Sequence, residues 1–126
     1  MKPMQVLASI ALTVAACAAH ALTVTPYSPE AVSQALNEKK AIALDFYADW
    51  CPTCRAQAKS LNQLKSSPNL DVTVFVVDYD KNVALRKQLK VAAQSTIVVF
   101  KAGKESARLI GQTEPDQIKA ALQTAL

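Results

Sequence analysis

The sequence predicts an α/β fold in which a central mixed β-sheet is flanked by helices, in the element order βαβαβαββα. Two apolar runs rich in β-branched residues alternate with helical patterns, and two further strand patterns near the carboxyl end are separated only by a tight turn. A Cys-x-x-Cys motif directly follows the first apolar run. The chain has 126 residues, of which 51% are hydrophobic and 19% charged, which is typical of one globular domain.

The amino-terminal half is expected to contain two strands and two helices. The weakly alternating segment 22–27 predicts a short first strand, and Ser28 followed by Pro29 starts a helix that runs to about Lys39. The run 41–47 (AIALDFY) predicts a central strand buried on both faces. The helix after the cysteine motif is expected to turn Cys54, Ala58 and Leu61 toward the core.

The carboxyl-terminal half completes the predicted sheet. The segment 71–78 (DVTVFVVD) is a second buried strand, and Asp80 is expected to cap a third helix. Segments 96–101 and 105–110 predict an antiparallel hairpin, and the last helix opens at Pro115. The third helix is expected to carry Val83, Leu85 and Leu89.

The charge pattern indicates an ordinary surface. The formal net charge is +4, but the lysines alternate with glutamate, aspartate and glutamine and form no block. Because nucleic-acid binding usually needs basic residues gathered on one face, we expect no nucleic-acid partner.

The first 21 residues are expected to be a secretory signal. The apolar segment 6–19 is too short to cross the ~30 Å hydrocarbon core as a helix, and the small-x-small sequence Ala19-His20-Ala21 follows it. Cleavage after Ala21 would leave a mature domain over 22–126 without a histidine, so Cys-His catalysis and histidine ligation of a metal are not expected.

A lipoprotein signal over 1–16 is the alternative. Val14-Ala15-Ala16-Cys17 resembles a bacterial lipobox, in which the cysteine is lipidated, and only then would the chain contact a membrane; an uncleaved signal anchor is a third possibility. Both cleaved forms place the domain in the periplasm or anchor it at the envelope. That compartment permits disulfides.

The two remaining cysteines are expected to have different chemistry. Cys51 falls near a helix N-cap, where backbone N–H groups and the helix dipole favour the thiolate, so it is the predicted nucleophile. Cys54 lies one turn further and faces the core, so it is the predicted resolving thiol. If the two cysteines were half of a structural zinc site, the site would need a second pair of ligands, which the mature chain lacks. A purely structural bridge would close too small a loop to stabilise the fold much.

At these residues the chain resembles the thioredoxin superfamily. The segment 44–55 (LDFYADWCPTCR) is similar to the active-site segment of that superfamily, 100–104 (FKAGK) resembles its carboxyl-terminal hairpin, and Gly111 matches a glycine after the last strand. The Pro-Thr pair between the cysteines is similar to that of membrane-tethered reductases of cytochrome c maturation, whose central insertion is absent here. The resemblance implies the thioredoxin fold and dithiol–disulfide exchange with protein thiols and disulfides.

The resemblance also implies roles for single residues. Asp45 matches the buried carboxylate that moves a proton for the resolving cysteine, and its apolar neighbours predict a raised pKa. The lysine that often accompanies this carboxylate in the superfamily is replaced by Val76, which is expected to raise the pKa of Asp45 further. The residues expected to contact substrate are Trp50, Pro52, Thr53, Gln94 and Ser95.

Ser95 is the main departure from the superfamily pattern, because it replaces a cis-proline that faces the cysteines. A cis peptide costs roughly 2.5–4 kcal/mol before a residue other than proline, so the Gln94–Ser95 bond is expected to be trans. We expect the serine hydroxyl to donate a hydrogen bond to the Cys51 thiolate and lower its pKa. Space for a metal ion beside the sulfurs is the alternative.

Together these features predict a periplasmic or envelope thiol:disulfide oxidoreductase that works in the reducing direction. A membrane electron donor is expected to supply it, and the protein is expected to be a monomer without a cofactor or resident metal. The alternative is a binding module in which the Cys51 and Cys54 thiolates take up copper(I).

Overall fold

The computed structural model describes residue 13 and residues 20–126. The predicted signal peptide over 1–21, and the alternative modification at Cys17, therefore lie outside the described residues except at His20 and Ala21. None of the described helices combines the length and apolar character needed to cross a bilayer. The elements are β1 (Thr23–Pro26), α1 (Pro29–Asn37), β2 (Ile42–Tyr47), α2 (Pro52–Leu64), β3 (Thr73–Asp78), α3 (Val83–Gln88), β4 (Thr96–Lys101), β5 (Lys104–Ile110) and α4 (Pro115–Gln123).

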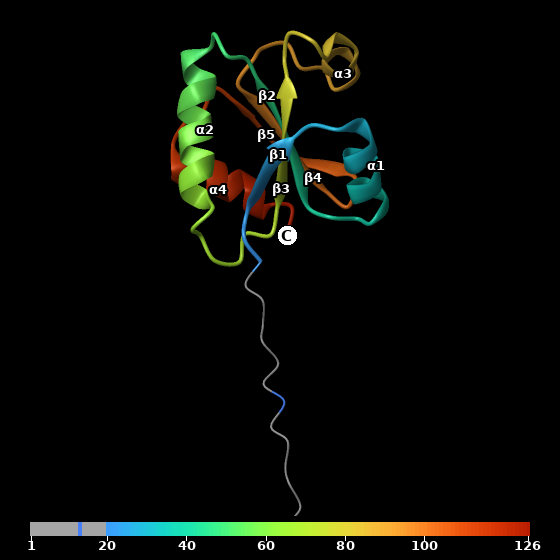
Figure 1. Ribbon diagram of the computed structural model, residues 1–126, viewed down its shortest axis with the longest axis vertical. Helices are drawn as coiled ribbons and strands as arrows, with labels where there is room; N and C mark the ends of the chain where they lie inside the picture. Colours follow the sequence, from blue (N-terminus) through green and yellow to red (C-terminus); the bar gives the residue numbers. More distant parts are fainter. Residues whose placement is uncertain (1–12, 14–19) are drawn as a thin grey trace, which may run out of the picture.

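The five strands form one mixed sheet in the order β1-β3-β2-β4-β5 (Figure 1). The strands β1, β3 and β2 run parallel, while β4 is antiparallel to both β2 and β5. This confirms the predicted mixed sheet and element order. Strand β2 lies at the centre, where Asp45 is paired with Val76 of β3 and with Ile97 of β4.

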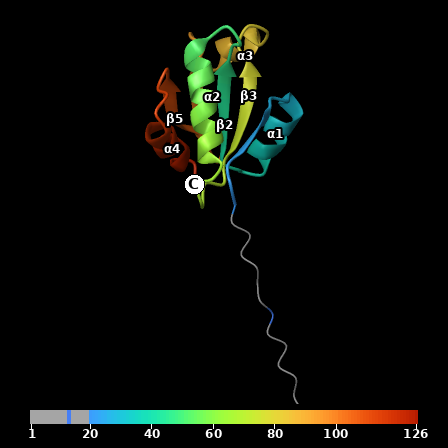
Figure 2. The same cartoon turned by 60° about the vertical axis from the view of Figure 1, so that its left-hand side comes forward.

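Helices cover both faces of the sheet. In Figure 2, α2 and α4 lie over one face and α1 over the other. The core on the α2 and α4 side includes Ala43, Leu61, Leu64, Val74, Ile97, Ile118 and Leu122. The core on the α1 and α3 side includes Val32, Ile42, Leu44, Phe46, Val77 and Val98. Because side chains alternate along β2, Asp45 projects from the same face as Ala43, beneath α2.

The buried face of α2 is more polar than expected. Cys54 and Leu61 are buried as predicted, but Ala58 is only half-buried, whereas Gln57 and Ser60 are buried. Both polar side chains donate hydrogen bonds to carbonyl groups of the chain segment after β5, which gives their donor groups partners inside the core.

The prediction that Asp80 caps the third helix is wrong. Helix α3 begins at Val83 after Asn82, and no side chain caps its first turn. The Asp80 carboxylate instead accepts a hydrogen bond from the Trp50 indole N–H at 2.8 Å. The helix ends before Leu89, and Val83 at its first position is exposed.

Candidate active site

The cysteine motif lies where β2 passes into α2. Cys51 is the N-cap residue of α2 and Pro52 occupies the first helical position, where its missing N–H costs nothing. The Cys51 Sγ accepts a hydrogen bond from the Cys54 backbone N–H at 3.2 Å. Both cysteines are free thiols and both are buried. The local sequence thus places the first sulfur at the positive end of the helix dipole and the second one turn inside.

The two thiols have opposite pKa shifts. Burial alone would raise the pKa of Cys51, but hydrogen bonds from the Cys54 side chain, the Ser95 hydroxyl and the backbone N–H groups of Cys54 and Thr53 outweigh it and lower that pKa. Burial raises the pKa of Cys54, and the neighbouring Cys51 sulfur raises it further. Cys51 is therefore the thiol that ionises first, and Cys54 keeps its proton.

The Ser95 hydroxyl lies between the two sulfurs. Its Oγ is 3.2 Å from the Cys51 Sγ and 3.0 Å from the Cys54 Sγ, so the structure adds a contact with Cys54 to the one expected with Cys51. The Gln94–Ser95 peptide is trans, as expected. A hydroxyl has a single proton to donate. When Cys51 is ionised, this geometry lets Ser95 donate its proton to the Cys51 thiolate and leaves the Cys54 S–H to donate to that thiolate or to the Ser95 Oγ.

The residues expected to contact substrate surround the sulfurs with unequal exposure. Trp50 is 59% exposed and its indole is tethered to Asp80. Pro52 is exposed, while Thr53 and Gln94 are half-buried. A hollow of about 260 Å³ beside the indole is lined by Tyr47, Ala48, Asp49, Trp50, Val76, Asp78 and Asp80. A partner that reaches Cys51 would therefore meet the indole and a carboxylate-rich rim.

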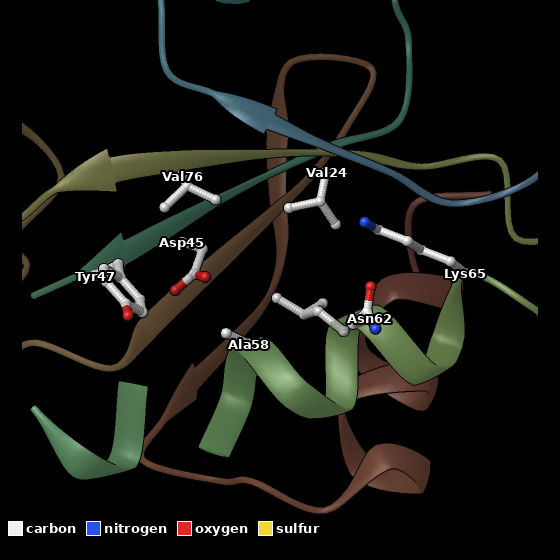
Figure 3. Close-up of a pocket in the computed structure, with 8 residues that line it drawn as sticks. Val24, Asp45, Tyr47, Ala58, Asn62, Lys65 and Val76 are labelled. Atoms are coloured by element: carbon white, nitrogen blue, oxygen red, sulfur yellow. The ribbon is translucent and has the colours of Figure 1, made fainter. Parts of the chain in front are cut away.

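Asp45 is buried at the wall of a cavity beneath α2 (Figure 3). Its side chain is 1% exposed, and its Oδ1 atom has no hydrogen-bond partner among the described residues. Burial raises the pKa of this carboxyl to about 7. The cavity, about 280 Å³ in volume, is lined by Val24, Asp45, Tyr47, Ala58, Leu61, Asn62, Lys65 and Val76. Figure 3 shows the carboxyl group directed from β2 into this space, toward α2.

A pKa near neutrality suits Asp45 to exchange protons in the pH range of the reaction. The position opposite Asp45 on β3 is Val76, which offers no charge to stabilise the carboxylate. Lys65, the cationic residue of the cavity lining, comes from α2 and is exposed. Among the described residues, no group of three or more His, Cys, Asp or Glu side chains gathers in a way that could hold a metal ion.

The sequence analysis missed Gln57 and Ser60. The Gln57 amide nitrogen donates to the carbonyl oxygens of Ser95 at 3.0 Å and Gln112 at 2.9 Å, and the Ser60 hydroxyl donates to the Thr113 carbonyl. Gln57 lies three residues after Cys54, so the helical period places both on one face. That spacing was the available signal for a polar residue beside the resolving thiol.

The geometry defines a class of protein. An ionisable thiol at a helix N-terminus, a protonated thiol one turn inside and a buried carboxyl under the same helix form the site of a dithiol–disulfide exchange protein. The Thioredoxin family model matches residues 23–124. This chain belongs to the thioredoxin family and is a thiol–disulfide oxidoreductase.

Relatives and solved structures agree with this placement. A thioredoxin of Alicyclobacillus acidocaldarius subsp. acidocaldarius is 31% identical over 93 residues, which cover 74% of this chain and 89% of the relative. Thioredoxin H4 of Arabidopsis thaliana is 34% identical over 85 residues, covering 68% of this chain and 71% of the relative. The crystal structure of Trxlp from Edwardsiella tarda EIB202 is 38% identical with a TM-score of 0.74, covering 79% of this chain and 98% of that one.

We expect Asp45→Asn to flatten the dependence of stability on pH. The pKa of Asp45 is about 7 in the folded protein against an ordinary value of 3.8, so between these values the native state holds a proton that the unfolded chain has released. The contribution of Asp45 to the stability of the parent protein is therefore full below about pH 4 and falls as pH rises toward 7. The difference between these two pKa values corresponds to a loss of about 4 kcal/mol in the free energy of unfolding, which the variant does not share.

The measurement is the free energy of unfolding in urea, at pH 4.5 and pH 7.5, for the reduced parent and the reduced variant. Asp116→Asn, at an exposed aspartate that forms no salt bridge among the described residues, is the matched control and is expected to follow the parent. Parallel pH dependences of the parent and Asp45→Asn would contradict a raised pKa for Asp45.

Proposed function

We propose that this protein is an exported thiol:disulfide oxidoreductase of the periplasm or envelope that reduces disulfides in partner proteins. The observation that carries the exchange chemistry is the pair of unlike thiols, with the pKa of Cys51 lowered and that of Cys54 raised. The exposed indole of Trp50 and the exposed Pro52 provide the surface against which a partner protein rests.

The exchange proceeds in two displacements that balance in electrons and protons. The Cys51 thiolate attacks one sulfur of the partner disulfide, forms a mixed disulfide and releases the other partner sulfur, which takes up a proton. Cys54 then loses its proton and attacks the Cys51 sulfur, which breaks the mixed disulfide and frees the second partner thiol. The partner gains two electrons and two protons, and this chain ends with a Cys51–Cys54 disulfide.

Asp45 is the base proposed for the second displacement. Cys54 has a raised pKa, so it needs a base to become a nucleophile. The Asp45 carboxyl, with a pKa of about 7, lies in the cavity beneath the helix that carries Cys54. Because the pKa lies near neutrality, the carboxylate is populated enough to accept the proton and the acid is able to return it.

The amino-terminal sequence supports the proposed location, and that location is the reason for proposing a membrane electron donor. The apolar segment 6–19 and Ala19-His20-Ala21 support export, and the Pro-Thr pair resembles that of envelope reductases. The compartment outside the cytoplasm lacks the cytosolic systems that keep thiols reduced. A reductant working there needs a membrane protein that returns electrons to its disulfide after each turnover.

The roles of the two cysteines are tested by single substitutions. Cys51→Ser is expected to abolish the reduction of insulin disulfides and the capture of partners, because it removes the thiol that ionises first. Cys54→Ser is expected to leave the first displacement intact and to accumulate mixed disulfides, since nothing resolves them. Non-reducing electrophoresis of the trapped adducts is the measurement, and the double variant is the control that traps nothing. Faster alkylation of Cys54 than of Cys51 at pH 6 would reverse the assignment.

Export is tested on protein isolated from the producing cell. Amino-terminal sequencing is expected to begin at Leu22, in the periplasmic fraction, because the residues before it have the small side chains that signal cleavage requires. Ala21→Lys is expected to leave the precursor uncleaved, whereas Cys17→Ser is expected to change nothing. A lipid-modified terminus at Cys17 would contradict the soluble form and support an anchored one.

A further inference from the structure

Gln57 is a polar residue on the buried face of α2. It has no exposed surface, and it lies three residues after Cys54. Its amide nitrogen donates to two backbone carbonyls, those of Ser95 and Gln112, while its Oε1 atom has no hydrogen-bond partner among the described residues. The side chain therefore contributes to the fold through the two hydrogen bonds that its amide nitrogen donates.

The backbone of Ser95 has a conformation that needs external support. Its φ of 63° lies in the left-handed region, which residues other than glycine seldom adopt. Three hydrogen bonds hold it: its N–H donates to the Phe46 carbonyl at 2.9 Å, and its carbonyl accepts from the Gly111 N–H at 2.9 Å and from Gln57 at 3.0 Å. Only the bond from Gln57 comes from a side chain.

We propose that Gln57 is a positioning residue for thiol–disulfide exchange, because its amide holds the Ser95 carbonyl and so keeps the Ser95 hydroxyl between the sulfurs of Cys51 and Cys54. This inference rests on the proposed function of those two thiols. The hydroxyl contacts are 3.2 Å and 3.0 Å long, and hydrogen bonds weaken steeply as geometry departs from ideal. Cys54 and Gln57 share one helix, so α2 carries both a sulfur and the amide that places the hydroxyl beside it.

A purely structural role would tie α2 to the segment after β5 without affecting the thiols. Ser60 provides that comparison, because its hydroxyl donates to the Thr113 carbonyl one turn further along the same face. Among the described residues, the Ser60 hydroxyl forms no hydrogen bond with Ser95 or with a cysteine. Ser60→Ala therefore removes a tie to the same segment and leaves the support of Ser95 in place.

The test is a double-mutant cycle read out as the pKa of Cys51. The four proteins are the parent, Gln57→Leu, Ser95→Ala and the double variant, and the pKa is taken from the pH dependence of thiolate absorbance and of iodoacetamide alkylation. Ser95→Ala is expected to raise the pKa of Cys51 by about one unit, since a hydrogen bond to a charged group is lost. Gln57→Leu is expected to raise it by roughly half a unit or more.

The effect of Gln57→Leu with and without the Ser95 hydroxyl distinguishes a positioning role of Gln57 from a role in packing alone. In the Ser95→Ala background, Gln57→Leu is expected to cause no further rise, because the hydroxyl that it positions is gone. Ser60→Ala is expected to leave the pKa of Cys51 unchanged even where it lowers stability. Gln57→Asn, which withdraws the amide by one methylene, is expected to give the same upward direction and serves if the leucine variant does not fold.

An unchanged pKa of Cys51 in both Gln57 variants would overturn the inference, as would an equal rise in the presence and absence of the Ser95 hydroxyl. The pKa is measured on the protein alone, without a partner. A parent that fails to reduce protein disulfides while the cycle gives the expected pKa pattern would count against the proposed function and leave the positioning role standing.

Discussion

The chemistry of this site depends on one hydroxyl between two sulfurs. The Ser95 Oγ lies 3.2 Å from Cys51 and 3.0 Å from Cys54, and it has a single proton to donate. When that proton is donated to the Cys51 thiolate, the Cys54 S–H can donate to the same thiolate or to the Ser95 Oγ, so all three groups have partners. The reverse arrangement would place the charge on the more deeply buried sulfur, away from the helix N-terminus, at a higher desolvation cost. The hydroxyl thus reinforces the asymmetry that the N-cap position of Cys51 begins.

Burial governs the two groups of the proposed second displacement, Cys54 and Asp45. Cys54 and Asp45 are both withdrawn from water, and burial raises the pKa of each, so that near neutrality Cys54 keeps its proton and Asp45 is about half ionised. The position beside Asp45 on β3 is Val76, and the cation of the cavity lining, Lys65, is exposed. A buried carboxyl without a close ion pair costs stability as it ionises, which is a cost that functional sites commonly retain. In the proposed mechanism, the sheet register that brings Asp45 under α2 is therefore as much a part of the site as the cysteine motif.

The fold and the dithiol could be predicted from sequence because they depend on local patterns. Apolar runs define β2 and β3, and Cys51 before Pro52 marks the start of α2. What the sequence did not predict depends on contacts between distant segments. Asp80 resembles a helix cap, but it binds the Trp50 indole thirty residues earlier in the chain. Gln57 resembles a surface residue of a helix, but it is buried, and its amide nitrogen donates to the carbonyl groups of residues 95 and 112 in the core.

The reduction potential of the Cys51–Cys54 couple, measured by equilibration with glutathione in the parent and in Ser95→Ala, tests the central claim most directly. The Ser95 hydroxyl stabilises the thiolate of the reduced form, and the disulfide offers no such charge, so its removal disfavours reduction. We predict a potential more negative by roughly 10–30 mV in Ser95→Ala, measured at a pH high enough to ionise Cys51 in both proteins. An unchanged or more positive potential would show that the hydroxyl does not stabilise the thiolate.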